Sequence, residues 1–143
     1  MYTNDAVIRP RYSETDQMGV IYNGYYYMWF EVGRSEFFRS LGYAYKQLEQ
    51  EGIILPLTES SCKYYKPAMY DEEVLIRTRV DYLKGIRLGF KYEVLRKEDG
   101  ELLAEGKTLH AFVDSNLKPI RYKMLSENFR AILDKLREDQ PGL

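Results

Sequence analysis

The chain has 143 residues, which is enough for one domain, and its net charge is -1, with 21 basic and 22 acidic side chains. This balance provides no long-range attraction to nucleic acid, and no apolar segment is long enough to cross a bilayer. The single cysteine, Cys62, cannot form an internal disulfide and no signal peptide is visible, so we expect a reducing, cytoplasmic location.

The first half of the chain predicts one strand and one long helix. Residues 6–12 are predicted to form an opening strand, which Pro10 confines to an edge or to an irregular pairing, and a turn-rich stretch follows it. Over 25–41, apolar residues recur at spacings of three and four, and aromatic residues also occupy other sides of the same helix. An apolar surface of that width is typical of a buried helix. Asn23 or Gly24 is the expected N-cap, and Gly42 the expected stop.

The second half predicts mainly strands. In chain order we expect a short amphipathic helix at 44–52, strands at 55–66, 73–83, 88–94 and 102–113, and a closing amphipathic helix at 125–136. Gly85 and the Asp99-Gly100 pair mark the turns between strands. The apolar face of the strand at 73–83 is predicted to consist of Val74, Ile76, Thr78, Val80 and Tyr82.

A sheet with one apolar face must be covered, and the long aromatic helix is the only candidate of sufficient length. We therefore expect an α+β fold in which a curved antiparallel sheet wraps around one central helix, within a single domain at 1–143. The exposed edges of such a sheet favour pairing with another copy, so a homodimer or homotetramer is expected.

Histidine and cysteine are too scarce for several kinds of catalytic site. A zinc site needs several ligands, and the chain has one histidine, His110, besides Cys62. No G-x-S-x-G motif, P-loop or dinucleotide-binding glycine motif is present. We expect no metal and no other cofactor. His110 is predicted to be a hydrogen-bonded strand residue, and Cys62 a packing residue.

Asp16 is the residue with the clearest chemical potential. It lies seven residues before Asn23, at the expected helix N-terminus. Unpaired amides there could polarise a carbonyl, while a nearby carboxylate attacks it or takes a proton from water. A thioester suits this chemistry because its thiolate leaves without a strong general acid. On spacing alone, however, a turn-capping role for Asp16 fits better.

The segment RYSETDQMGVIYNGYYYMWFEVGRSEFF, at 11–38, resembles the hotdog-fold acyl-CoA thioesterases and is most similar to their hydroxybenzoyl-CoA thioesterase-like branch. The resemblance continues through KYYKPAMYDEEVLIRTRV at 63–80, Gly106 and Val113-Asp114. The residues that carry the opening motif are Tyr12, Glu14, Asp16, Gly19, Tyr22, Phe30, Glu31 and Arg34.

This resemblance implies a hotdog fold and hydrolysis of an acyl-CoA thioester to a carboxylic acid and free coenzyme A, which is part of the substrate. Asp16 matches the catalytic acid of the family, and the backbone amide of Asn23, together with that of Gly24, matches the group that polarises the carbonyl. Many relatives carry histidine or another aromatic residue where this chain has Asn23. Glu31 is a second candidate acid, although an ion pair with Arg34 is the favoured interpretation.

The acyl group is expected in an aromatic slot beside the helix. The predicted substrate-binding residues are Tyr22, Tyr26 and Phe30 for the acyl group and Lys63, Lys84 and Arg87 for the phosphates of coenzyme A. Two alternatives use the same fold. One is a protein that binds an acyl ligand without cleaving it. The other is a hydroxyacyl-thioester dehydratase, which the position of His110 disfavours because such enzymes need a histidine near the helix.

Overall fold

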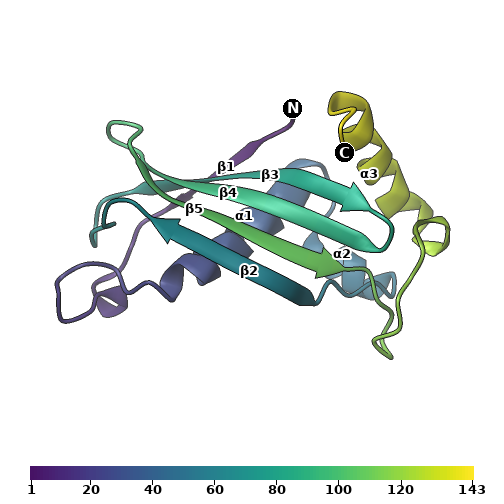
Figure 1. Ribbon diagram of the computed structural model, residues 1–143, viewed down its shortest axis with the longest axis horizontal. Coiled ribbons are helices and arrows are strands. Elements are labelled where there is room, and N and C mark those ends of the chain that lie inside the picture. Colours follow the sequence, from purple (N-terminus) through teal and green to yellow (C-terminus); the bar gives the residue numbers. More distant parts are fainter.

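The computed structural model describes residues 1–143 and contains one five-stranded antiparallel sheet with the strand order β1-β3-β4-β5-β2. Figure 1 shows the strands side by side, with the longest helix packed along one face. The strands are β1 (Asn4–Ile8), β2 (Leu57–Tyr64), β3 (Val74–Lys84), β4 (Arg87–Arg96) and β5 (Leu102–Ala111). The helices are α1 (Tyr25–Ser40), α2 (Tyr45–Gln50) and α3 (Glu127–Asp139), with short 3-10 turns η1 (Tyr12–Glu14) and η2 (Tyr122–Met124).

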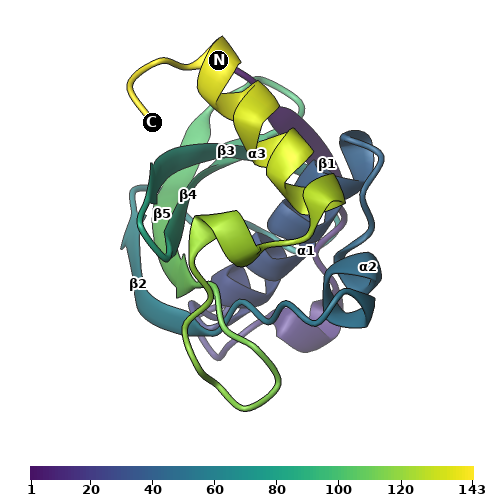
Figure 2. The same ribbon diagram turned by 90° about the vertical axis from the view of Figure 1, so that its right-hand side faces the viewer.

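The long helix α1 runs through the hollow of the curved sheet, and α3 lies across one end of it (Figure 2). The buried side of α1 carries residues at spacings of three and four: Tyr26, Trp29, Phe30, Gly33, Phe37 and Phe38. Beyond its C-terminus, Gly42 has φ +80°, the left-handed conformation that commonly ends helices. A curved antiparallel sheet around one central helix is the hotdog fold, so the predicted fold is confirmed.

The apolar face of β3 differs from the prediction at its last residue. Val74, Ile76, Thr78 and Val80 are buried, whereas Tyr82 is 39% exposed and Leu83 is buried in its place. The register shifts between Val80 and Tyr82, because Val80 pairs with Phe90 while Tyr82 pairs with the next residue back, Gly89. This β-bulge inserts one residue and thereby reverses the side chains that follow it.

The opening strand is shorter than predicted. β1 ends at Ile8, and Tyr12 belongs to η1 instead of the predicted strand over 6–12. Pro10 has no amide to donate to a neighbouring strand, although its carbonyl accepts a hydrogen bond from Asp71. The chain leaves the sheet here and enters the loop that precedes α1. None of the three helices combines the length and apolar character needed to cross a membrane.

Candidate active site

The loop that carries Asp16 is a tight, hydrogen-bonded turn. Thr15 and Ile21 form an isolated antiparallel bridge, and the Asp16 amide donates to the Val20 carbonyl at 2.9 Å. The Gly19 amide donates to the Asp16 carbonyl at 3.0 Å, and Gly19 has φ +79°, which favours glycine. The backbone at Asp16 is therefore fixed on both sides.

Three further hydrogen bonds hold this loop, and one of them ties it to the rest of the fold. The buried Glu14 accepts a hydrogen bond from the Arg11 amide through its carboxylate, at 2.7 Å, and one from the Tyr22 amide through its carbonyl, at 2.9 Å. The Ile21 amide donates to the Ala68 carbonyl at 3.0 Å. Because Ala68 lies just beyond β2, this bond brings the loop before α1 beside the end of the edge strand.

The two carboxylate oxygens of Asp16 have different surroundings. Oδ1 accepts a hydrogen bond from the Met18 amide at 2.8 Å, which is the turn-capping contact expected of an aspartate. Oδ2 accepts no hydrogen bond within the chain, and no lysine or arginine forms an ion pair with Asp16. The half-buried side chain is thus oriented by one oxygen while the other remains available.

The N-terminus of α1 offers unpaired donors. Gly24 is the N-cap, as predicted, and neither its amide nor that of Asn23 donates a hydrogen bond within the chain. The Asn23 carbonyl accepts from the Tyr26 amide at 3.3 Å and from the Tyr64 hydroxyl at 3.1 Å. Free amides at this end of a helix form a partial positive site that attracts oxygen atoms carrying negative charge.

A pocket of about 300 Å³ joins these features. It is lined by Asp16, Met18, Val20, Ile21, Asn23, Tyr26, Tyr64, Tyr65, Lys66 and Pro67. Inside it, the Tyr26 and Tyr64 rings meet edge to face with centroids 4.9 Å apart. The Tyr26 hydroxyl accepts a hydrogen bond from the Ala68 amide at 3.2 Å. The carboxylate of Asp16 and the start of α1 therefore border the same cavity.

The three predicted acyl-binding residues lie in different environments. Tyr26 lines the pocket. Tyr22 is half exposed and packs on Gly24, where an added Cβ would approach the Tyr22 ring to 2.9 Å. Phe30 is fully buried and stacks on Tyr92 with ring centroids 4.5 Å apart, so in the single chain it belongs to the core and not to the pocket wall.

The three predicted phosphate-binding cations do not gather at this pocket. Lys63 is exposed on β2, in register with Glu105. Lys84 and Arg87 flank the β3–β4 turn, at the opposite end of the sheet from the loop before α1 (Figure 1). The cation that lines the pocket is Lys66, which forms an ion pair with Glu101.

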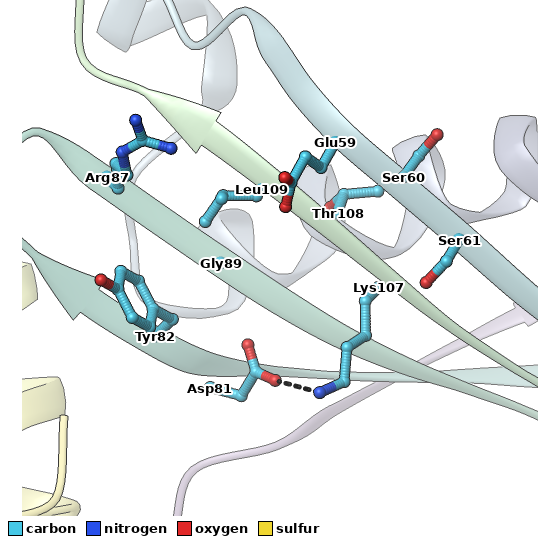
Figure 3. A pocket seen from close by; sticks show the side chains of 10 residues that line it. All are labelled: Glu59, Ser60, Ser61, Asp81, Tyr82, Arg87, Gly89, Lys107, Thr108 and Leu109. Carbon is cyan, nitrogen blue, oxygen red and sulfur yellow. Dashed lines mark ion pairs between the residues drawn. The ribbon is translucent and has the colours of Figure 1, made fainter.

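Arg87 contributes instead to a wider depression of about 790 Å³ on the face of the sheet away from α1 (Figure 3). Lys107 and Asp81 form an ion pair there at 3.5 Å. Gly89, at the centre, is buried, and a Cβ on it would come within 2.9 Å of the Tyr82 side chain. Asp16 has no part in this depression.

One wall of the pocket was not predicted as part of the site. The sequence predicts only the end of a strand at Tyr64, Tyr65 and Lys66, before Pro67, although this segment is unusually aromatic. Their position beside Asp16 depends on the strand order, which places β2 at the sheet edge next to β5. Sequence spacing carries no information about that adjacency.

His110 is a hydrogen-bonded strand residue, as predicted. Its Nδ1 donates to the Leu55 carbonyl at 3.1 Å, so its Nε2 accepts from the Thr108 hydroxyl at 2.9 Å. Thr108 in turn accepts from the Tyr92 hydroxyl at 2.6 Å. Burial lowers the pKa of His110 to about 4, which keeps the ring neutral. No three His, Cys, Asp or Glu side chains are grouped as metal ligands.

The favoured interpretation of Glu31 is wrong. Glu31 is exposed on α1 and forms no ion pair with Arg34. Arg34 lies instead beside the hydroxyls of Tyr45 and Tyr92, toward the sheet. The helical spacing of three residues brings Glu31 and Arg34 to neighbouring positions, but Arg34 is half buried and its Nε has no hydrogen-bond partner.

These features of fold and site agree with comparisons to known proteins. The family model described as the thioesterase-like superfamily matches residues 10–133, and the chain belongs to this family.

Relatives in sequence and structure cover most of the chain. The protein named "Putative acyl-CoA thioesterase YneP", from Bacillus subtilis, is 30% identical over 139 residues, which are 96% of this chain and 100% of that relative. The acyl-CoA thioester hydrolase YbgC of Escherichia coli is 29% identical, over 78% of this chain and 84% of its own. The crystal structure of DHNA-CoA thioesterase from Staphylococcus aureus superimposes with a TM-score of 0.92 and 34% identity, covering 100% of this chain and 97% of that one.

Proposed function

We propose that this protein hydrolyses an acyl-CoA thioester to a carboxylic acid and free coenzyme A, with Asp16 as the catalytic carboxylate. One observation carries the proposal: Asp16 and Asn23 line the same pocket, and the Asp16 carboxylate keeps one unpaired oxygen while the amides at the start of α1 remain unpaired. The names of the relatives from B. subtilis, E. coli and S. aureus support the choice of an acyl-CoA substrate.

In the proposed reaction, the amides of Asn23 and Gly24 bind the thioester carbonyl oxygen. Negative charge grows on this oxygen as the carbonyl carbon is attacked, so fixed donors stabilise the transition state more than the bound substrate. The carbon–sulfur bond then breaks and the electron pair leaves with the coenzyme A thiolate. A thiolate is stable enough at neutral pH to leave without a metal or a strong general acid, and the proposal therefore includes no cofactor.

Asp16 can act in either of two ways. As a nucleophile, its free Oδ2 attacks the carbonyl carbon, expels the thiolate and forms a mixed anhydride that water then hydrolyses. As a general base, it takes a proton from a water molecule that attacks the carbon directly. Rapid acid quenching followed by intact-protein mass measurement separates these routes, since only the first gives a transiently acylated protein.

The pocket walls favour a flat acyl group. Tyr26, Tyr64 and Tyr65 present aromatic surface, which packs well against another ring. The similarity to an S. aureus DHNA-CoA thioesterase also makes aromatic acyl groups the first to test. A dehydratase receives no support, because both ring nitrogens of His110 are engaged inside the core.

The decisive experiment measures thiol release from aromatic and aliphatic acyl-CoA compounds by the wild type and by Asp16→Asn. An asparagine can still accept the Met18 hydrogen bond, so the turn should survive while the negative charge is lost. We expect turnover to fall by about 100-fold or more, with an unchanged circular dichroism spectrum.

Asp114→Asn is the matched control. Asp114 also caps a turn, accepting hydrogen bonds from the amides of Asn116 and Lys118 at 2.8 and 3.0 Å, but it lies outside the pocket. This variant should keep full activity. Near wild-type hydrolysis by Asp16→Asn would refute the assignment of Asp16. Binding of acyl-CoA by the wild type without any thiol release would support the non-catalytic binding protein.

A further inference from the structure

The peptide group between Asn23 and Gly24 has one end held and the other end free. Its carbonyl oxygen accepts a hydrogen bond from the Tyr64 hydroxyl at 3.1 Å, whereas its N–H, which belongs to Gly24, donates to no group of the chain. Tyr64 is the last residue of β2, so the hydroxyl reaches the start of α1 from the edge strand. No sequence pattern or resemblance had assigned a role to this tyrosine.

We propose that Tyr64 is a positioning residue that orients and strengthens the Gly24 amide as a donor to the substrate carbonyl. The inference rests on the proposed function, in which the Gly24 amide polarises the substrate carbonyl, and it adds that Tyr64 holds this amide in place. Tyr64 acts through the peptide plane and not on the reacting atoms.

Two physical effects support this role. A hydrogen bond to the carbonyl of a peptide withdraws electron density through the amide and makes its N–H a better donor. The same bond limits rotation of the peptide plane about its neighbouring single bonds, so the N–H is aimed before substrate arrives. The only other bond to this carbonyl within the chain is the long one from the Tyr26 amide, at 3.3 Å, which leaves the plane weakly held without Tyr64.

The Tyr64 hydroxyl is itself well placed to donate. Its ring packs edge to face on the buried Tyr26, with an interplanar angle of 89°. The Tyr64 side chain is 44% exposed, and its phenol is protonated at neutral pH, since partial desolvation and the neighbouring Cys62 thiol raise its pKa above the already high value of an ordinary tyrosine. A carbonyl oxygen can only accept, and the hydroxyl must therefore be the donor in this contact.

The test is Tyr64→Phe, which removes the hydroxyl and retains the ring that packs on Tyr26. We expect kcat to fall about 10-fold while KM changes less than about twofold, because the lost polarisation acts mainly in the transition state. Tyr2→Phe is the control: the partly buried Tyr2 also packs its ring on another aromatic ring, that of Phe37, and its hydroxyl bonds Ser40, away from the pocket. This control should leave both constants unchanged.

A spectroscopic readout separates positioning from a general structural effect. In the Asp16→Asn background, a bound aroyl-CoA with a ¹³C-labelled thioester carbonyl should show its carbonyl stretch at lower frequency than in water, since hydrogen bonds from the amides weaken the C=O bond. Adding Tyr64→Phe should remove about half of this shift. Adding Tyr2→Phe should leave it intact.

The outcomes are distinguishable. A normal kcat in Tyr64→Phe overturns the inference. A lowered kcat with an undiminished carbonyl shift also overturns it, because Tyr64 would then serve only the structure. Two other results refute instead the proposed function on which the inference depends. One is that the Asp16→Asn protein, with Tyr64 intact, causes no shift of the carbonyl stretch. The other is that Asp16→Asn is fully active. A lowered kcat together with a reduced shift supports the inference.

Discussion

Asp16 combines a structural contact with the features required of the proposed catalytic carboxylate. A turn-capping role and a catalytic role are alternatives when only the sequence is considered. In the structure, Oδ1 caps the turn by accepting from Met18, and Oδ2 stays unpaired beside the pocket. Since the cap fixes the carboxylate without neutralising it, the two interpretations are compatible, and the proposed role for Asp16 benefits from the capping bond.

A buried histidine makes the stability of this protein depend on pH. The folded-state pKa of His110 is about 4, while an unfolded histidine titrates near 6.5. Between these values the unfolded chain binds more protons than the folded one. Stability from His110 is therefore complete above pH 6.5 and is lost as pH falls toward 4, by up to about 3 kcal/mol.

Urea denaturation between pH 4 and 7 checks this expectation. His110→Gln removes the titrating group, and its free energy of unfolding should decline less steeply toward acid than that of the wild type. The carboxylates titrate in both proteins, so the difference between the two curves isolates the histidine. Parallel curves would show that His110 is protonated at the same pH in the folded and unfolded chains.

At the scale of elements, two glycines set how closely α1 approaches the sheet. A Cβ on Gly33 of α1 would come within 2.6 Å of the Thr78 hydroxyl, and one on Gly106 of β5 would come within 2.3 Å of the Phe30 ring. Such distances are shorter than real carbon contacts, so helix or sheet would have to move. The close approach lets Phe30 stack on Tyr92.

Gly106→Ala should accordingly destabilise the fold. We expect the free energy of unfolding to decrease by about 1–3 kcal/mol, because the extra methyl group overpacks the core at Phe30. Urea titration gives the value. Gly142→Ala is the control, since a Cβ there meets no atom within 4 Å. An effect of Gly106→Ala no larger than that of the control would show that the core accommodates the methyl group.

The elements themselves were largely predictable, because each buries one face with a regular period. The spacing over 25–41 indicated α1, and alternation of Leu88, Phe90, Tyr92 and Val94 indicated β4. Tyr82 was placed on the wrong face because a β-bulge depends on the partner strand, here on Gly89. Local periodicity cannot reveal a register shift between strands.

The site was predictable only in its local part. Asp16, Asn23 and Gly24 lie within one short segment, and the helix N-terminus places them near one another. Positive charge alone favours Lys84 and Arg87 as phosphate-binding residues, but the hairpin carries them to the other end of the sheet. Tyr64 and Lys66 were missed as pocket residues because their position follows from the strand order of the whole sheet.

At the scale of the whole molecule, β2 is an open edge. It pairs with β5 on one side and with no strand on the other, and most of its residues are exposed. An unprotected edge of this length favours pairing with a second copy of the same strand. We therefore predict a homodimer or a homotetramer built from such dimers, as measured by light scattering after size exclusion.

Ser60→Lys should weaken that assembly. Ser60 lies near the middle of β2, so a two-fold pairing of the edges would bring the two introduced lysines together, and like charges across strands repel. Thr3→Lys, at an exposed position before β1, should not change the mass. A monomeric wild type at micromolar concentration would contradict the prediction.

The bonds that join residues 14–26 to residues 64–68 have a kinetic consequence. The Ile21 amide meets the Ala68 carbonyl, and the Tyr64 hydroxyl meets Asn23, across more than forty residues of chain. Contacts between such distant segments form late during folding, after the intervening chain has been ordered. Recovery of thioester cleavage after dilution from denaturant should therefore coincide with the slowest structural phase, which would make enzymatic turnover a reporter of completed assembly.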